Sequence, residues 1–264
     1  MRRISLILVV FSVLALSCKN KDGSGKKLNL FPVSEDIKLG KQVSDEINSN
    51  PAEYPILNPT QYVEVYNYID KISQTILNSG EVKHKDDFAW EFKIIDKDDV
   101  VNAFCTPGGY IYVYTGLIKY LDSEDQLAGV IGHEIAHADL RHSTRQMTKL
   151  YGVQVLTSVV LGDREALKQV TNGLVGLKFS RSHETESDNA SVRYLCNTPY
   201  NAAGGGGFFE KIVESGGGGT PEFISTHPSP DNRVENFKNQ KVQMGCKGDK
   251  TYDQEYARIK GLLK

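Results

Sequence analysis

The chain has few cysteines and no surplus of positive charge. After its apolar N-terminal segment, it has no further apolar stretch long enough to cross a bilayer. Its four cysteines include no C-x-x-C pair, which argues against a disulfide-stapled scaffold. Lysine and arginine total 31 against 33 aspartate and glutamate residues, for a net charge of −2. Without a basic excess to neutralise phosphates, nucleic acid is not an expected partner. No repeat with a period of roughly 20 to 50 residues is visible, which argues against solenoids and propellers.

The composition is that of a globular protein. Its 264 residues include 13 tyrosines and 10 phenylalanines, enough aromatic material for a core. No break in composition requires two domains, so residues 34–264 are expected to form one. Apolar residues recur at helical spacing through most of this range and alternate near residues 88–95, so we expect a mainly helical α+β fold with one small antiparallel sheet. The expected helices cover residues 34–48, 60–77, 123–142, 144–161, 164–179, 183–196, 230–240 and 251 onward, and the expected strands cover 88–95, 100–104 and 110–114.

Short local patterns mark where these elements begin and end. Ser123–Gln126 and Thr251–Gln254 have the sequence of a capping box, which predicts a helix start at each. Thr106–Gly109 predicts a turn between the second and third strands. Two glycine runs, at 204–207 and 216–219, bracket a short apolar segment.

The first residues are typical of an export signal. Arg2 and Arg3 precede the apolar run Ile4–Leu16, and Cys18 follows shortly after it. This run suits the core of a signal peptide and is short for a membrane-spanning helix. We therefore predict a signal peptide over residues 1–17 and lipidation of Cys18. A cleaved signal with an incidental cysteine is the alternative, because Leu16 is bulky for a lipoprotein signal.

Residues 18–33 are predicted to form a lipid-anchored tether. Lys19–Lys27 is polar and contains glycine and serine, a composition typical of flexible linkers. The protein is therefore expected to be exported and to face the periplasm, touching a membrane only through its lipid. Lys19, rather than aspartate, follows the predicted lipidated residue, which favours the outer over the inner membrane.

Three cysteines remain beyond the predicted anchor. In an oxidising compartment they allow one disulfide and one free thiol. We predict that Cys196 pairs with Cys246 and that Cys105 stays free.

The strongest chemical signal is His133-Glu134-Ile135-Ala136-His137. Residues four apart lie on one face of a helix, so His133 and His137 can reach one metal ion, while Glu134 flanks it and can take a proton from water. Two unconnected histidines on a helix face are the alternative, but the pattern arises by chance in only roughly 1% of such chains. Imidazole and carboxylate ligands around an open position are typical of catalytic zinc, so we expect one Zn²⁺ per chain.

The third protein ligand has to come from further along the chain. A metzincin would have glycine at position 140 and histidine at position 143, where this chain has leucine and serine. Glu184 is the best candidate, with Asp188 one turn later, placed to orient a ligating histidine. His183 is a rival ligand, and Glu186 is expected to point away from this face by about 160°.

Four blocks of sequence resemble the zinc metallopeptidase family that includes the CaaX prenyl endopeptidases and the HtpX heat-shock protease (peptidase family forty-eight, of the gluzincin type). The resemblance is strongest to its soluble periplasmic members of the lipoprotein type. The blocks are Val101–Phe104 with Pro107–Ile111, His133–His137, Ser180–Asp188, and Gly216–Gly219 with Thr226–Arg233. The resemblance implies a zincin-type catalytic domain with the small sheet beside the active-site helix.

This resemblance implies that His133, His137 and Glu184 bind zinc and that Glu134 is the general base. It also assigns a role to His227, since a matching histidine in periplasmic relatives lies over the metal and fills its fourth position. The glycine run at 216–219 would let that loop move. Support of a developing oxyanion and an ordinary loop residue are the alternatives for His227.

The resemblance also indicates how substrate binds. The segment Asn102, Ala103 and Phe104 resembles an edge strand beside the cleft, with which an extended peptide can pair through its main chain. For Asn102, a polar residue facing a turn is the alternative. Polypeptides are therefore the expected substrates.

Together these features predict a zinc-dependent metalloendopeptidase of the bacterial cell envelope. Its expected substrates are misfolded or stalled polypeptides, cleaved by a water that Glu134 activates. A periplasmic chaperone or assembly factor with little proteolysis, acting with the envelope assembly machinery, is the alternative.

Overall fold

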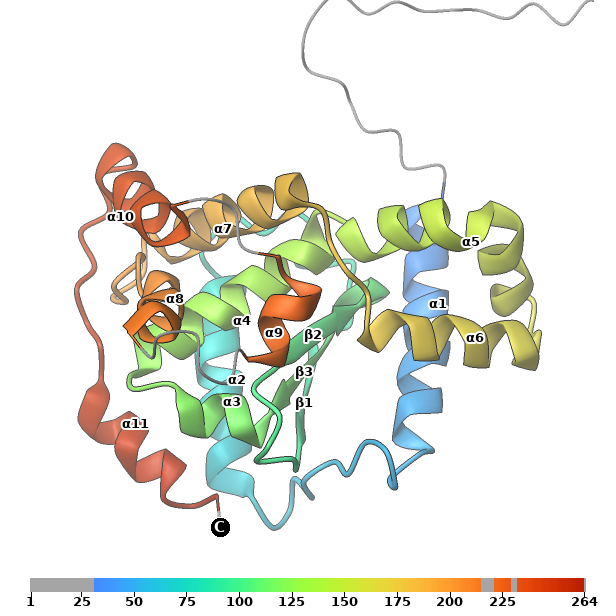
Figure 1. Cartoon of the computed structure of the whole chain (residues 1–264), viewed down its shortest axis with the longest axis horizontal. Helices are drawn as coiled ribbons and strands as arrows, with labels where there is room; N and C mark the ends of the chain where they lie inside the picture. Colours follow the sequence, from blue (N-terminus) through green and yellow to red (C-terminus); the bar gives the residue numbers. More distant parts are fainter. Residues whose placement is uncertain (1–30, 215–220, 229–231, 264) are drawn as a thin grey trace, which may run out of the picture.

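The structure is a computed structural model that describes residues 31–214, 221–228 and 232–263 (Figure 1). The predicted signal peptide, Cys18, most of the predicted tether and the second glycine run lie outside the described residues. Within the described part of the chain, no helix combines the length and the apolar character needed to cross a membrane.

Three strands form a small sheet in the order β1-β3-β2. β2 (Ala103–Thr106) and β3 (Tyr110–Tyr114) make the predicted hairpin through the short helix η1 (Pro107–Gly109), where Gly108 and Gly109 have positive φ angles of 74° and 86° that favour glycine. β1 (Glu91–Ile95), however, pairs with β3 in parallel. The expectation of a purely antiparallel sheet is therefore wrong, because the chain crosses from β1 to the far edge before it makes the hairpin.

The central strand divides the core into two clusters. Side chains alternate along a strand, so Ile111 and Val113 point into one cluster, whereas Tyr110, Tyr112 and Tyr114 point into the other. All five side chains are buried. The sheet is thus covered on both faces, which confirms the mainly helical α+β class.

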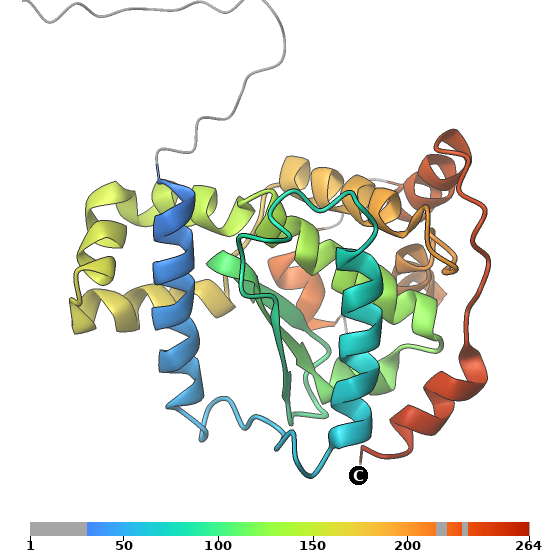
Figure 2. The same ribbon diagram turned by 180° about the vertical axis from the view of Figure 1, so that it is seen from behind.

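Helices α1 (Val33–Asn48), α5 (His142–Val160) and α6 (Arg164–Val175) pack together on the tyrosine side of the sheet (Figures 1 and 2). The start of α1 is tied to the start of α5, because Arg141 donates hydrogen bonds to the Asp36 carboxylate and the Phe31 carbonyl, and the Thr144 hydroxyl donates to Asp36 at 2.9 Å. This contact fixes the chain where it leaves the helix that carries the two motif histidines.

That helix, α4 (Glu124–Asp139), is enclosed by the rest of the fold. It packs against α7 (Arg181–Leu195), α8 (Gly205–Glu214), α2 (Val63–Leu77) and β2. Small residues allow this approach: a Cβ added at Gly129 would lie 2.3 Å from the Gly205 backbone. Three glycines of the first run, Gly205–Gly207, therefore form the start of α8, where this helix touches α4.

The predicted capping boxes do not form. Ser123 is the N-cap of α4, but its hydroxyl donates to Asp125, and Gln126 accepts from the Asp122 amide at 2.9 Å. The last helix, α11, begins at Asp253, after Thr251, without a side-chain cap. Packing decides both starts, since the Glu124 amide donates to the Thr251 carbonyl at 2.9 Å and joins the two segments.

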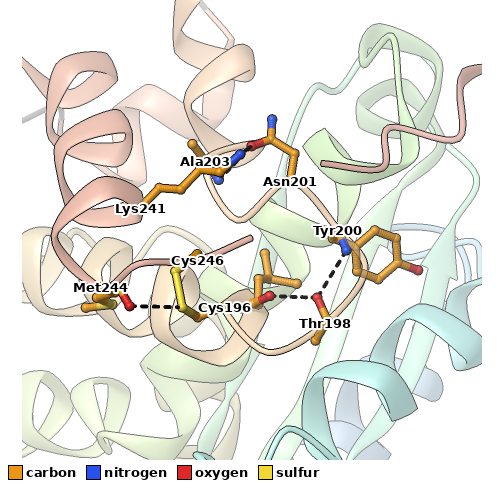
Figure 3. Close-up of a disulfide and its surroundings, with 9 residues drawn as sticks. Cys196, Thr198, Tyr200, Asn201, Ala203, Lys241, Met244 and Cys246 are labelled. Atoms are coloured by element: carbon orange, nitrogen blue, oxygen red, sulfur yellow. Dashed lines mark hydrogen bonds between the residues drawn. A yellow bond between two sulfur atoms is a disulfide. The ribbon is translucent and has the colours of Figure 1, made fainter. Parts of the chain in front are cut away.

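The C-terminal part of the chain returns across α4 and α7. It consists of α8, α9 (Glu222–Thr226), α10 (Arg233–Gln243) and α11 (Asp253–Lys260), while the short α3 (Thr115–Tyr120) links the sheet to α4. The predicted disulfide is confirmed: Cys196 at the end of α7 bonds to Cys246 after α10, with Cα atoms 4.6 Å apart (Figure 3). Cys105 is free, as predicted, and its side chain is buried.

Candidate metal centre

Four side chains converge between α4, α7 and the end of α9. His133, His137, Glu184 and His227 are all buried, and one potential ligand atom from each lies within 4.8 Å of those of the others. The four-residue spacing on α4 puts both motif imidazoles on the face that meets α7. The N-cap of α7, Ser180, accepts from the His183 amide at 3.2 Å and starts the helix one turn before Glu184.

The distances within this group fit a zinc ion. Ligands about 2.0 to 2.1 Å from a tetrahedral zinc are about 3.3 Å from one another. Glu184 Oε1 lies 3.3 Å from His137 Nε2 and from His227 Nδ1, and Glu184 Oε2 lies 3.4 Å from His133 Nε2. His133 Nε2 lies 3.3 Å from His227 Nδ1 and 2.9 Å from His137 Nε2. The two-nitrogen, one-carboxylate set with a further histidine is a donor chemistry typical of zinc.

Glu134 lies beside this group. Its carboxylate is buried, and neither oxygen accepts a hydrogen bond from the residues that the structure describes. His227 Nε2 lies 3.5 Å from Glu134 Oε1. Burial raises the pKa of Glu134, as expected for a carboxylate removed from water. A buried carboxylate that accepts no hydrogen bond is costly to maintain, and a catalytic base that accepts a proton from water is one function that accounts for it.

Asp188 and Arg233 support the ring of His133 on the side away from the ligand group. Asp188 Oδ1 lies 2.9 Å from His133 Nδ1, the geometry that the sequence predicted for the residue one turn after Glu184. Arg233 donates to both oxygens of Asp188 at 2.7 Å and to Glu184 Oε2 at 3.1 Å. Arg233 was not expected at the site, although it closes the last of the four blocks. Arg233 is 45 residues from Asp188 in the sequence, so no local spacing predicts that the two side chains meet.

His137 is held by a second group that sequence reasoning missed. His142 Nδ1 lies 3.1 Å from His137 Nδ1, and His142 Nε2 lies 3.1 Å from Glu186 Oε2. His183, the rival ligand, lies outside the ligand group and stacks on His142 with ring centroids 4.3 Å apart. Burial lowers the pKa of His142 to about 4. Glu186 points away from Glu184, as expected, but it reaches the site through His142.

The helix α9 covers the site and delivers His227 to it. The Phe223 amide donates to the Val101 carbonyl at 3.1 Å, and the Phe179 amide donates to the Thr226 carbonyl at 3.0 Å. Phe223 also stacks on His227, with ring centroids 4.1 Å apart. Only 1% of His227 is exposed, so its side chain is buried against the other three members of the group.

β2 forms one edge of the sheet beside this group. The Asn102 carbonyl accepts from Tyr114, so the backbone of Ala103 points away from β3. The Ala103 amide instead donates to the side chain of Asn102 at 2.9 Å, while Phe104 stacks on Tyr112. Asn102 is fully buried and thus does not face a turn at the surface.

Comparisons with known proteins agree with this geometry. The model of Peptidase family M48 matches residues 65–241. The mitochondrial metalloendopeptidase OMA1 of Arabidopsis thaliana is 32% identical over 154 residues, which cover 57% of this chain and 31% of the relative. OMA1 of Schizosaccharomyces pombe is 29% identical over 174 residues, or 63% of this chain and 50% of the relative. The β-barrel assembly-enhancing protease of Escherichia coli K12 is 29% identical over 171 residues, or 59% of this chain and 35% of the relative.

The fold and the buried His and Glu cluster are those of a zincin-like metallopeptidase domain. The chain belongs to peptidase family M48, whose members use zinc. It spans between 31% and 50% of the length of the three relatives described above.

Proposed function

We propose that this protein is a zinc-dependent metalloendopeptidase that cleaves polypeptides. The observation that carries the proposal is the buried group of His133, His137 and Glu184 at tetrahedral spacing, next to the buried Glu134 carboxylate, which accepts no hydrogen bond within the described part of the chain. Membership of peptidase family M48 and the metalloendopeptidase relatives support the same activity.

The residues divide the chemistry between them. His133, His137 and Glu184 would hold zinc, which supplies a Lewis acid that polarises the scissile carbonyl and acidifies water. Glu134 takes the proton of the attacking water and passes it to the leaving amine. Enclosure of the site keeps the carboxylate poorly solvated and therefore basic enough to accept that proton.

His227 would restrain this chemistry in the resting protein. Its Nδ1 atom takes the remaining corner of the ligand group, and its Nε2 atom faces Glu134. Water and substrate therefore have to displace the end of α9 before they reach the site. The contact of α9 with Val101 next to β2 would be lost in the same movement, which frees the strand edge at Asn102, Ala103 and Phe104 for an extended substrate.

Replacement of Glu134 with Gln tests the activity. The variant should bind zinc with the stoichiometry of the wild type and lose cleavage of an unstructured substrate such as casein. Glu165→Gln is the matched control, since Glu165 is exposed on α6 and should tolerate the change. Full cleavage by the Glu134→Gln variant would refute the assignment of the base.

For location, we propose a lipid-anchored protein of the bacterial envelope that faces the periplasm, with the outer membrane favoured. The basic start, the apolar run and Cys18 support the anchor. Cys18→Ala should release the protein into the soluble fraction after cell lysis, and unchanged sedimentation with membranes would count against lipidation.

A role as an envelope chaperone or assembly factor is the second candidate. It is favoured by the covered site and by the printed name of one relative, a β-barrel assembly-enhancing protease. The same Glu134→Gln variant separates the two: a chaperone role persists in it, whereas a role that requires cleavage is lost.

A further inference from the structure

We infer that His142 and Glu186 form a hydrogen-bonded relay that orients the zinc-binding side chain of His137. This inference rests on the proposed zinc site and deepens it. His142 would be a positioning residue, since it contacts the Nδ1 atom of His137 but is not itself one of the four candidate ligands.

The two ring nitrogens of His137 face different neighbours. Its Nε2 atom faces the ligand group, 3.3 Å from Glu184 Oε1, and its Nδ1 atom lies 3.1 Å from His142 Nδ1. A histidine that gives its Nε2 lone pair to a metal carries its proton on Nδ1. His137 Nδ1 therefore donates, and His142 Nδ1 accepts.

That assignment fixes the tautomer of the next ring. If His142 Nδ1 accepts, its proton is on Nε2, and the atom 3.1 Å from that nitrogen is Glu186 Oε2, an acceptor. Each link thus has one donor and one acceptor, and the Ser187 hydroxyl, which lies 3.1 Å from His142 Nδ1, can donate to the same accepting atom. The ring of His142 is fully buried and is held in plane by its stack on His183, which makes an interplanar angle of 13°.

The two motif histidines are consequently supported in different ways. His133 contacts a carboxylate directly, since Asp188 lies 2.9 Å away and is itself held by Arg233. His137 reaches its carboxylate, Glu186, only through the neutral ring of His142. Asp188 is buried, whereas the Glu186 side chain is 41% exposed and lies 3.7 Å from Arg145. The relay therefore connects one ligand of the metal to the surface of the protein.

Zinc affinity, measured by competition with a chelator, tests the relay without reference to activity. His142→Phe keeps a flat ring but removes the acceptor, and it should weaken zinc binding by about 10- to 100-fold. His142→Asn presents a side-chain oxygen near the position of Nδ1 and should restore a large part of the loss. His84→Phe is the matched control, because His84 is another buried histidine that lies outside the ligand group.

Glu186→Ala provides a second variant in case His142→Phe does not fold. Because its side chain is partly exposed, Glu186→Ala should fold, weaken zinc binding and shift the visible absorption bands of the cobalt-substituted protein. It should add no further loss in the His142→Phe background, since both changes break the same chain.

Two results would overturn the relay while leaving the zinc site intact. One is a His142→Phe variant that binds zinc as tightly as the His84→Phe control. The other is a pair of effects from His142→Phe and Glu186→Ala that simply add. A wild-type protein that does not bind zinc would instead overturn the proposed zinc site and the relay together.

Discussion

Removal of the Cys196–Cys246 bond should destabilise the protein by a predictable amount. The bond closes a loop with a sequence separation of 50 residues. Loop-closure entropy for a loop of this length gives a stabilisation of about 4 kcal/mol at 25 °C. For a chain of this size that corresponds to a fall of roughly 8 to 16 °C in the thermal midpoint.

The double variant Cys196→Ser/Cys246→Ser is the cleanest perturbation, because it leaves no lone thiol at either position. Its unfolding in urea should be compared with that of the oxidised wild type at one fixed zinc concentration, since a bound metal adds to the stability of the folded state. A reductant should lower the midpoint of the wild type toward that of the double variant and should leave the double variant unchanged.

The loop model would be refuted if the double variant and the oxidised wild type unfolded at the same urea concentration. Zinc affinity gives a second check. The bond lies at the end of α7 and after α10, outside the ligand group, so zinc binding by the folded double variant should match the wild type.

Three further substitutions probe the site and its support. His227→Ala should raise basal cleavage of casein, because it removes the atom that fills the fourth corner; a loss of roughly 10²- to 10³-fold would show instead that His227 supports the oxyanion. Arg233→Leu should destabilise the protein by about 3 to 5 kcal/mol in urea unfolding, because it leaves two buried carboxylates without their cation, and a change under 1 kcal/mol would contradict this. Gly129→Ala should lower the free energy of unfolding in urea by about 1 to 3 kcal/mol, because the added Cβ would meet the Gly205 backbone at 2.3 Å. Gly176→Ala is the control, since a Cβ there meets nothing within 4 Å. Equal losses of stability in the two variants would contradict the close packing of α4 on α8.

Much of the fold follows from local pattern in the sequence. Apolar spacing predicted α1, α2 and α4 to α7, alternation predicted β1, and the turn at Thr106–Gly109 predicted the β2–β3 hairpin, because these signals depend on residues close in the chain. The short helix α3 was not predicted. The parallel pairing of β1 was not predictable in this way, since strand direction depends on the path of the connecting chain. The capping boxes failed for the same kind of reason: a contact between Glu124 and Thr251, far apart in sequence, replaced the local hydrogen bonds.

In the site, too, the features that depend on residues close in the sequence were predictable, and those that depend on distant residues were not. The motif on α4 predicted two side chains on one face, and Glu184 was proposed from its sequence context and spacing. The residues that support them could not be found by spacing. Arg233 lies 45 residues after Asp188, and His142 follows a turn in which Arg141 takes a left-handed conformation. Only the folded chain brings these side chains behind the imidazoles.

The position of the disulfide bears on how the site opens. The loop that it closes contains α8, α9 and α10, and therefore both His227, which covers the ligand group, and Arg233, which supports it from behind. Displacement of His227 requires α9 to leave Val101 and Phe179, but Arg233 must stay in contact with Asp188 if His133 is to keep its orientation. The two ends of the segment are fixed by a covalent bond, and α10 packs on α7 and α8. If His227 is displaced as proposed, the described helix that has to move is therefore α9, while the contact of Arg233 with Asp188 would stay in place.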